Sequence, residues 1–226
     1  PTTSSPSTFS TTTYTLVVPA YLPVVRVNGV SFALDSGFPK TGFSQATFQF
    51  WMNGTSASGN SNYTFATDPQ APWVTVNPAT GVVTFVAEPA SAQTVNITIT
   101  DTRTNEVTPY SFTIDTWFVN NGSNKMTATQ ADFYCAGLGR GYGTPSYLKV
   151  TNAAYNDYGT RAPDERLWDE WGDVGVFSSS GWVSSTYWVL ESKGSKRDNV
   201  YLGLTGGSLT SNLPSSLFYV ACSRTL

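Results

Sequence analysis

The stretch MTATQADFYCAGLGRG, residues 126–141, divides the chain into two kinds of sequence pattern. It predicts an α-helix, because Thr127 is a suitable N-cap and Gln130, three residues later, completes a capping box. Apolar residues then recur at helical spacing on one face: Ala131, Tyr134, Cys135 and Leu138. The glycines at positions 137 and 139 end the predicted helix.

Residues 13–118, before this helix, show short runs of alternating apolar and polar residues between turn signals. Val95, Ile97 and Ile99, for example, alternate with polar residues, and PWVTVNPATGVVTFVAEP (72–89) contains two strand-like runs joined by a turn. Short strands at this spacing predict an all-β sandwich. Residues 1–12 are rich in Ser, Thr and Pro, which predicts a linker, and we expect the chain to belong to a longer protein.

Residues 119–226 combine helices with strands, which predicts an α+β unit. A second helix is expected from about Pro163 to Asp173, with Trp168 and Trp171 on its apolar, core-facing side. Trp188 lies in a β-rich run and is also expected in the core. Three strand-like runs follow the second helix: Thr186–Leu190, Val200–Leu204 and Ser216–Ser223. No flexible linker separates the two units, so we expect them to be stiffly joined, with Trp117 near the junction.

The two cysteines, Cys135 and Cys222, lie on the first helix and the last strand of this unit. One disulfide between them is favoured over two independent buried thiols, and it implies an oxidising compartment. Closing a loop of this length stabilises the fold by about 4.5 kcal/mol if the effect is entropic.

Composition excludes several classes of function. The chain has an acidic pI of about 4.8 and no basic stripe, so nucleic acid is not expected as a partner. It contains no histidine, which removes Ser-His-Asp and Cys-His catalysis, and two cysteines without histidine rule out most zinc sites. No apolar run reaches about 18 residues, the length of a membrane-spanning helix. We therefore expect neither enzymatic activity nor a metal or other cofactor.

Two irregular segments carry candidate binding residues. The segment Thr151–Arg166 is rich in the tyrosine and arginine that are typical of interfaces, although a plain solvated loop remains open. Its candidates are Tyr155, Tyr158, Arg161, Asp164 and Arg166. The second segment, SSSGWVSS (178–185), holds Trp182, either as an exposed anchor or as a cover over the core edge. Tyr187 follows it as a further candidate.

Several motifs resemble the intimin/invasin family of bacterial adhesins. The resemblance rests on ADFYCAGLG (131–139), LWDEWGD (167–173) and FYVACSR (218–224), and on the upstream stretches FPKTGFSQATFQF (38–50) and WVTVNPATGVVTF (73–85). It implies a bacterial immunoglobulin-like sandwich followed by a C-type-lectin-like domain at 119–226. It also implies a monomeric, non-enzymatic tip on the bacterial cell surface, held in the outer membrane only through an upstream barrel. Such a tip binds a host protein receptor or a soluble host glycoprotein.

Two other functions remain open. A carbohydrate-binding module would stack Trp182 or Tyr187 on a sugar, but a calcium–sugar site is not supported, because the lectin-like triplet Ala162-Pro163-Asp164 lies before the second helix, on the wrong side. A purely structural stalk segment would use no loop for binding. No receptor-contacting residue of the family can be matched to a position here.

Overall fold

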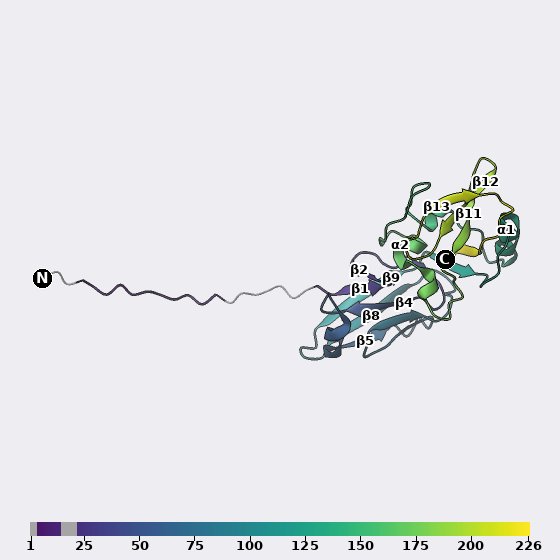
Figure 1. The fold of residues 1–226 in the computed structure, drawn as a ribbon. Coiled ribbons are helices and arrows are strands. Elements are labelled where there is room, and N and C mark those ends of the chain that lie inside the picture. Colours follow the sequence, from purple (N-terminus) through teal and green to yellow (C-terminus); the bar gives the residue numbers. More distant parts are fainter. Residues whose placement is uncertain (1–3, 15–21) are drawn as a thin grey trace.

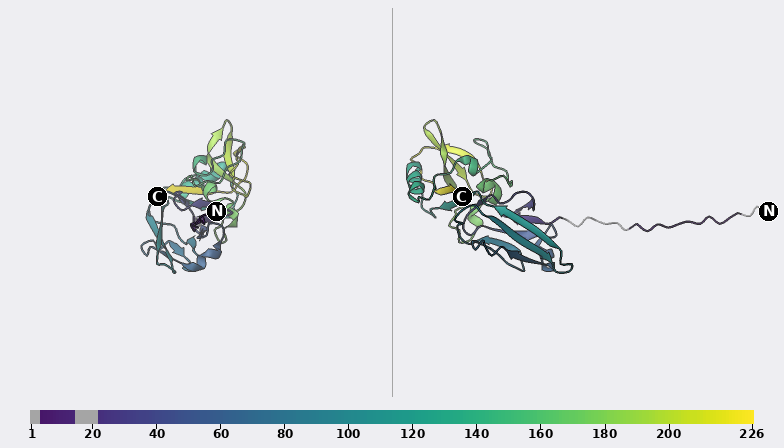
Figure 2. Two further views of the ribbon diagram at one scale, coloured as in Figure 1. Left: turned by 90° about the vertical axis from the view of Figure 1, so that its left-hand side faces the viewer. Right: turned by 180° about the vertical axis from the view of Figure 1, so that it is seen from behind.

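The computed structural model describes residues 4–14 and 22–226 (Figure 1). Residues 4–14 are exposed, contain no helix or strand and extend away from the folded body (Figure 2). The sequence predicts the sandwich from residue 13. The first strand described begins at Val24, and residues 15–21 lie outside the described part.

The N-terminal unit contains two antiparallel sheets packed face to face. The five-stranded sheet has the order β2-β1-β4-β7-β6, and the three-stranded sheet has the order β5-β8-β9. The first sheet contains β1 (Val24–Val27), β2 (Val30–Ala33), β4 (Thr47–Trp51), β6 (Val74–Val76) and β7 (Val82–Phe85). The second contains β5 (Tyr63–Thr67), β8 (Thr94–Asp101) and β9 (Val107–Thr113), and the 3₁₀ helix η1 (Ala57–Asn62) precedes β5. The predicted sandwich is confirmed.

Strand β8 shows why these sequences form a sandwich. Val95, Ile97 and Ile99 are buried while the residues between them are exposed or half-buried, so the period of two in the sequence separates core from solvent. Aromatic rings from the facing sheet complete the core, with Phe50 stacked on Phe65 at 5.7 Å between ring centroids.

A third sheet joins the two units. Its order is β14-β10-β3, formed by β3 (Thr41–Gly42), β10 (Thr116–Asn120) and β14 (Ala221–Thr225). Strand β10 runs parallel to β3 of the sandwich and antiparallel to β14 of the C-terminal unit. The buried Trp117 faces Gly42, where a Cβ atom would lie 2.8 Å from the indole, so glycine permits this close approach. The expected position of Trp117 at the junction is confirmed.

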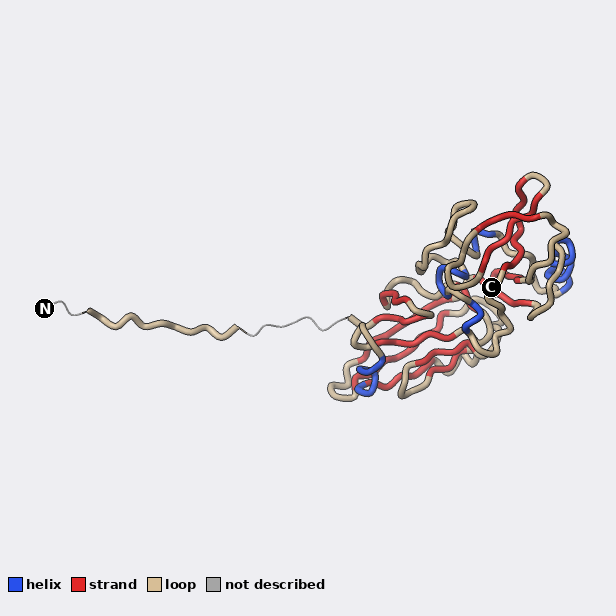
Figure 3. Tube along the Cα trace, viewed as in Figure 1, coloured by secondary structure: helices blue, strands red, loops and turns tan. Residues whose placement is uncertain are grey.

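The C-terminal unit lies at the end of the molecule opposite the N-terminal tract (Figures 1 and 2). Its helices are α1 (Ala128–Gly137), η2 (Tyr147–Lys149), α2 (Leu167–Trp171) and η3 (Val174–Val176). Strands β11 (Thr186–Lys193), β12 (Lys196–Tyr201) and β13 (Leu209–Asn212) form an antiparallel sheet in that order. Much of the chain between η2 and β11 is loop (Figure 3). The predicted α+β unit is confirmed.

Helix α1 has the predicted ends and the predicted covalent bond. The side chain of Thr127 accepts from the Gln130 N–H, and the side chain of Gln130 accepts from the Thr127 N–H, which confirms the capping box. Cys135 and Cys222 are fully buried and form a disulfide with a Cα–Cα distance of 5.3 Å, which ties α1 to β14 as expected.

Other predicted elements differ in extent. The second helix spans only Leu167–Trp171, not Pro163–Asp173, because Glu165 adopts a left-handed φ of 70° and Gly172 one of 71°. The strand predicted over Val200–Leu204 ends at Tyr201, where a glycine-rich loop begins. The last predicted run, Ser216–Ser223, forms isolated bridges before the regular strand β14 starts at Ala221.

The tryptophans expected in the core are there. Trp168, Trp171 and Trp188 are buried, and so is Trp182. Across residues 4–14 and 22–226, no helix has the length and apolar character needed to cross a membrane.

Candidate functional site

The interface between the two units removes one face of the C-terminal unit from possible partners. Trp171 of α2 inserts among sandwich aromatics, with its ring centroid 5.1 Å from that of Phe38 and 5.3 Å from that of Phe43. Its indole N–H donates to the carbonyl and hydroxyl oxygens of Thr41. The buried aromatic contacts and the hydrogen bonds of Trp171 to Thr41 hold the two units against each other.

Glu170 is fully buried in this interface. Its carboxylate accepts from the Thr41 N–H at 2.9 Å, the Thr41 hydroxyl at 2.5 Å, and the N–H groups of Lys40 and Glu165. Burial raises the pKa of Glu170 to about 7, and the hydrogen bonds that favour the ionised form oppose only part of that effect. A carboxyl group at the joint therefore titrates near neutral pH.

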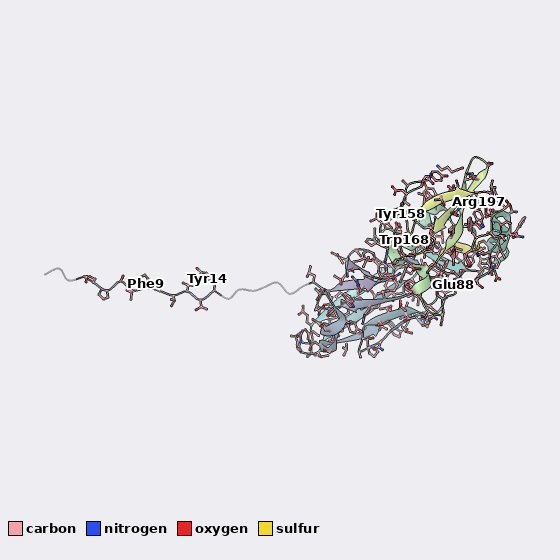
Figure 4. All side chains as sticks on the ribbon, viewed as in Figure 1. Phe9, Tyr14, Glu88, Tyr158, Trp168 and Arg197 are labelled. Carbon is pink, nitrogen blue, oxygen red and sulfur yellow. A yellow bond between two sulfur atoms is a disulfide. The ribbon has the colours of Figure 1, made fainter. Side chains whose placement is uncertain are left out.

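Glu88 holds a second, more exposed part of the interface (Figure 4). The guanidinium groups of Arg140 and Arg224 donate to it at 2.8 and 2.9 Å, and the Tyr142 hydroxyl also donates to it. Burial pushes the pKa of Glu88 upward, but these three donors together lower it below its ordinary value. The sandwich and the C-terminal unit are therefore joined by charge-assisted bonds as well as by apolar packing.

Arg161, a predicted binding residue, is part of the interface. Its Nη1 donates to the carbonyl of Asn28 at 2.8 Å, its Nη2 donates to that of Val27 at 3.1 Å, and Nε and Nη2 also bond carbonyls within α2. Burial lowers the pKa of Arg161 to about 10. The guanidinium is committed to holding the two units together, so we remove it from the candidate binding surface.

Trp182 and Tyr187 are also withdrawn from solvent. Trp182 is only 6% exposed and packs against Phe43 and Tyr187, at centroid distances of 5.7 and 5.3 Å, so of the two alternatives it covers the core. Tyr187 is 1% exposed and its hydroxyl accepts from the Val183 N–H; burial raises its pKa to about 12. In the described structure neither ring is therefore presented to solvent.

The remaining candidates lie on the segment Thr151–Arg166, here called the tyrosine loop. Tyr158 is 68% exposed and Tyr155 is 39% exposed. The Tyr155 hydroxyl hydrogen-bonds the Ser211 hydroxyl at 2.5 Å, and the Lys193 ammonium lies 4.5 Å from its ring centroid. Asp164 and Arg166 are half-buried and paired with each other at 3.0 Å, at the base of this loop.

A groove of about 490 Å³ separates the tyrosine loop from a second loop, Gly203–Gly207, here called the glycine loop. Trp168 lies beside Tyr158 in its lining (Figure 4). Leu204 is 79% exposed on the opposite side, so two large apolar side chains flank the groove. The lining residues are Tyr158, Gly159, Trp168, Leu204, Thr205 and Gly206.

Both sides of the groove are held by hydrogen bonds. Gly159 N–H donates to the Gly206 carbonyl at 3.2 Å, and the Trp168 indole N–H donates to the Gly203 carbonyl at 2.9 Å. A Cβ atom at Gly207 would lie 2.6 Å from the Trp168 ring, so glycine allows the loop backbone to pack on the indole. Hydrogen bonds and close packing thus hold the two loops together on either side of the groove.

Asn152 ties the two ends of the tyrosine loop together. Its amide Nδ2 donates to the Thr160 carbonyl at 2.8 Å and to Asp164 Oδ2 at 3.2 Å, while its backbone N–H donates to Asp169 Oδ1 at 3.3 Å. Asp169 is fully buried. Its pKa rises to about 9, first because of burial and second because Asp164 faces it. In the described ranges, no group of three or more acidic, cysteine or histidine residues could hold a metal ion.

Comparison with known proteins places these features in a family. Residues 23–114 match the family described as "Invasin, domain 4". The Invasin of Yersinia enterocolitica is 28% identical over 201 residues, which cover 88% of this chain and 22% of that protein. The crystal structure of invasin, described as a bacterial integrin-binding protein, is 30% identical with a TM-score of 0.76, over 91% of this chain and 40% of that one.

These matches support assignment to the intimin/invasin family: residues 23–114 match its invasin domain, and most of the chain shares the fold of invasin. Its two units have the immunoglobulin-like and C-type-lectin-like folds of that family. The C-terminal 282-residue intimin fragment, solved in complex with the intimin-binding domain of the translocated intimin receptor, is 18% identical with a TM-score of 0.58 and supports the fold alone. The chain spans less than a quarter of the length of the Yersinia Invasin.

The sequence predictions missed half of the groove. Leu204 and the glycine loop were assigned in part to a strand, and Trp168 was assigned to the core without its second role in lining the groove. The stretch LGLTGGS (202–208) carries the signal that could have found this loop, because its glycines disfavour a regular strand and allow tight turns.

Proposed function

We propose that this chain is the receptor-binding tip of a bacterial surface adhesin and that it binds a host protein through the groove between the tyrosine loop and the glycine loop. The observation that carries the proposal is the pair of exposed apolar side chains, Tyr158 and Leu204, on either side of the groove. Aromatic anchors beside a pocket are typical of binding hot spots. Similarity to an integrin-binding relative supports a host-cell receptor as the partner.

The rest of the molecule fits rigid presentation by a monomer. The sandwich acts as a spacer, because the shared sheet, the buried Trp171 and the Glu88 contacts hold it firmly against the C-terminal unit. A rigid tip loses little conformational entropy when it docks. In this proposal the groove faces outward from the bacterial surface, and attachment to the outer membrane lies upstream of these residues.

A host protein is favoured over a carbohydrate as the ligand. The two rings considered for sugar stacking, Trp182 and Tyr187, are buried. The groove lining contains no acidic or amide side chain, and such groups commonly hydrogen-bond sugar hydroxyls, whereas an apolar side chain of a protein needs none of them.

The test is binding of the whole chain to cultured epithelial cells and to a panel of immobilised integrin ectodomains. Replacing Tyr158 and Leu204 by alanine should weaken binding about tenfold or more, the scale of an interfacial hot spot. Phe133→Ala is the matched control, because Phe133 is 75% exposed on α1, outside the groove lining.

Three results would contradict the proposal. Equal losses for the double variant and for Phe133→Ala would show that the groove has no special role. Binding to a glycan array but not to deglycosylated cell protein would indicate a lectin. If the chain bound neither cells nor host protein, and no groove substitution changed attachment, the chain would be a purely structural stalk segment.

A further inference from the structure

Two buried carboxylate oxygens lie at the base of the tyrosine loop without a donor. Asp164 Oδ1 and Asp169 Oδ2 receive no hydrogen bond from any N–H or O–H group in the described chain. Asn152 brings the two carboxyl groups together, because its amide donates to Asp164 Oδ2 and its backbone N–H donates to Asp169 Oδ1, and Asp164 raises the pKa of Asp169. Two ionised carboxylates in this arrangement would repel each other, and each buried oxygen would remain unsatisfied.

We propose that Asp164 and Asp169 share one proton, and that this proton holds the base of the tyrosine loop in place beside the groove. A proton on Asp169 Oδ2 makes that atom a donor and Asp164 Oδ1 its acceptor, so one hydrogen bond satisfies both atoms. Binding through the groove then weakens in alkaline solution, where the proton is lost. The effect on binding rests on the proposed function, whereas the shared proton itself does not.

The neighbouring charges assign the proton to Asp169. Arg166 Nη1 donates to Asp164 Oδ2 at 3.0 Å, so the negative charge of the pair is favoured on Asp164. Asp169 receives only the backbone N–H of Asn152 on its other oxygen. Arg161 is the other charged group that acts on Asp169, but its hydrogen bonds go to backbone carbonyls. The adjacent Glu170 directs its carboxylate toward Thr41 and away from this pair.

The shared proton acts on the loop through Asn152. The amide of this residue bonds Asp164 and the Thr160 carbonyl, and its backbone N–H bonds Asp169. The two ends of the loop and α2 therefore meet at one point. Ionisation of Asp169 would place two like charges there, and separating them would displace the loop that carries Tyr158. Asp164 and Asp169 are positioning residues, since neither lines the groove.

The first measurement uses the unaltered chain. A ¹³C NMR titration of the aspartate carboxyl groups should show one resonance that titrates above pH 7, and Asp164→Asn should move that resonance to lower pH by removing the facing charge. All aspartates titrating near pH 4 would overturn the proposal. A rise in melting temperature on adding Ca²⁺ at pH 7.5, absent in Asp169→Asn, would also overturn it, because a cation would then be the occupant.

The second measurement uses Asp169→Asn, in which the amide Nδ2 can donate to Asp164 Oδ1 at any pH and so replaces the proton. The melting temperature of the unaltered chain should fall between pH 7 and 9.5, and that of Asp169→Asn should fall less. Glu106→Gln, which removes an exposed carboxylate on the sandwich, is the control and should behave like the unaltered chain. Identical profiles for all three proteins would refute the shared proton.

The third measurement joins the shared proton to binding, with formaldehyde-fixed epithelial cells as the probe at pH 7.0 and 9.5. Because the pKa of Asp169 is raised by burial and by Asp164, fewer pairs keep the proton at pH 9.5 than at pH 7.0, so binding of the unaltered chain should drop severalfold. For Asp169→Asn the ratio of binding at the two pH values should be closer to one. If Asp169→Asn lost as much binding as the unaltered chain, the shared proton would not control binding. If the NMR and melting results hold but no cells are bound at either pH, the proposed function fails and the shared proton stands.

Discussion

The tyrosine loop and the segment Ser178–Ser185 resemble each other in sequence, since both are irregular, polar and punctuated by aromatic residues. In the structure they have opposite surroundings. Trp182 is buried against Phe43 of the sandwich, while Tyr158 stands 68% exposed beside the groove. Local composition marks both segments as loops. Which of them is free to bind a partner depends on where the sandwich packs against the C-terminal unit. The residues of either segment alone do not determine that contact.

Replacing the aromatic residue of each segment should separate their roles most clearly. Trp182→Ala removes a buried indole from the joint and should destabilise the chain by about 3–5 kcal/mol. Tyr158→Ala removes an exposed ring and should change stability by no more than about 0.5 kcal/mol. Urea unfolding followed by circular dichroism measures both. Similar losses would mean that the two segments do not differ as the structure indicates.

Titration should separate the two faces of α2, because Glu170 faces the joint and Asp169 faces the tyrosine loop. The folded-state pKa of Glu170, about 7, lies above its ordinary 4.5, so the folded chain holds a proton that the unfolded chain releases. Stability from this group is therefore greatest below pH 4.5, falls as the pH rises to 7 and is constant above it. The expected fall between pH 5 and 8 is about 2–3 kcal/mol at most.

Glu170→Gln is the variant that isolates this effect, because its side-chain carbonyl can still accept from Thr41 while no longer titrating. The slope of unfolding free energy between pH 5 and 7 should become smaller in this variant without vanishing, because Asp169 also contributes there, and the slope between pH 7 and 9 that we assign to Asp169 should remain. Glu88 and Asp132 have lowered pKa values, so their contribution to the unfolding free energy is lost as the pH falls. This loss occurs in acid, below the range of pH 5 to 9 used for the comparison. If the unfolding free energy of Glu170→Gln depended on pH in the same way as that of the unaltered chain, Glu170 would not be the group that titrates near neutral pH.

Features set by nearby residues could be predicted from the sequence. The capping box of Thr127 and Gln130 depends on four consecutive positions, and the burial of Val95, Ile97 and Ile99 depends on alternation within one strand. Cys135 and Cys222 could be paired because the chain offers no other cysteine. The two units and their fold classes follow from such local signals, added along the chain.

Features set by distant residues could not be predicted. Arg161 looked like an interface residue by type and is one, but its partners are the carbonyls of Val27 and Asn28 inside the same chain. The short extent of α2 depends on Glu165 taking a left-handed conformation, which its sequence neighbours do not signal. Leu204 and Tyr158 meet at one groove because hydrogen bonds between residues far apart in the chain, such as that from Gly159 to Gly206, join the two loops.

The two arginines of the tyrosine loop offer the smallest and most local comparison. Arg161→Ala removes four partly buried hydrogen bonds to backbone carbonyls at the joint and should cost about 2–3 kcal/mol. Arg166→Ala removes one bond to the Leu148 carbonyl and the partly exposed pair with Asp164, and should cost about 1 kcal/mol. Both changes remove one positive charge, so a difference between them reports the surroundings of the side chain and not the net charge.

Arg161→Lys sharpens this comparison. A lysine keeps the charge but cannot reach Val27, Asn28 and the α2 carbonyls at once, because one ammonium group replaces a planar fork of donors. Arg161→Lys should therefore be nearly as unstable as Arg161→Ala in urea unfolding. Full recovery of stability in Arg161→Lys would mean that charge, and not the bonds to both units, holds this end of the tyrosine loop against the sandwich.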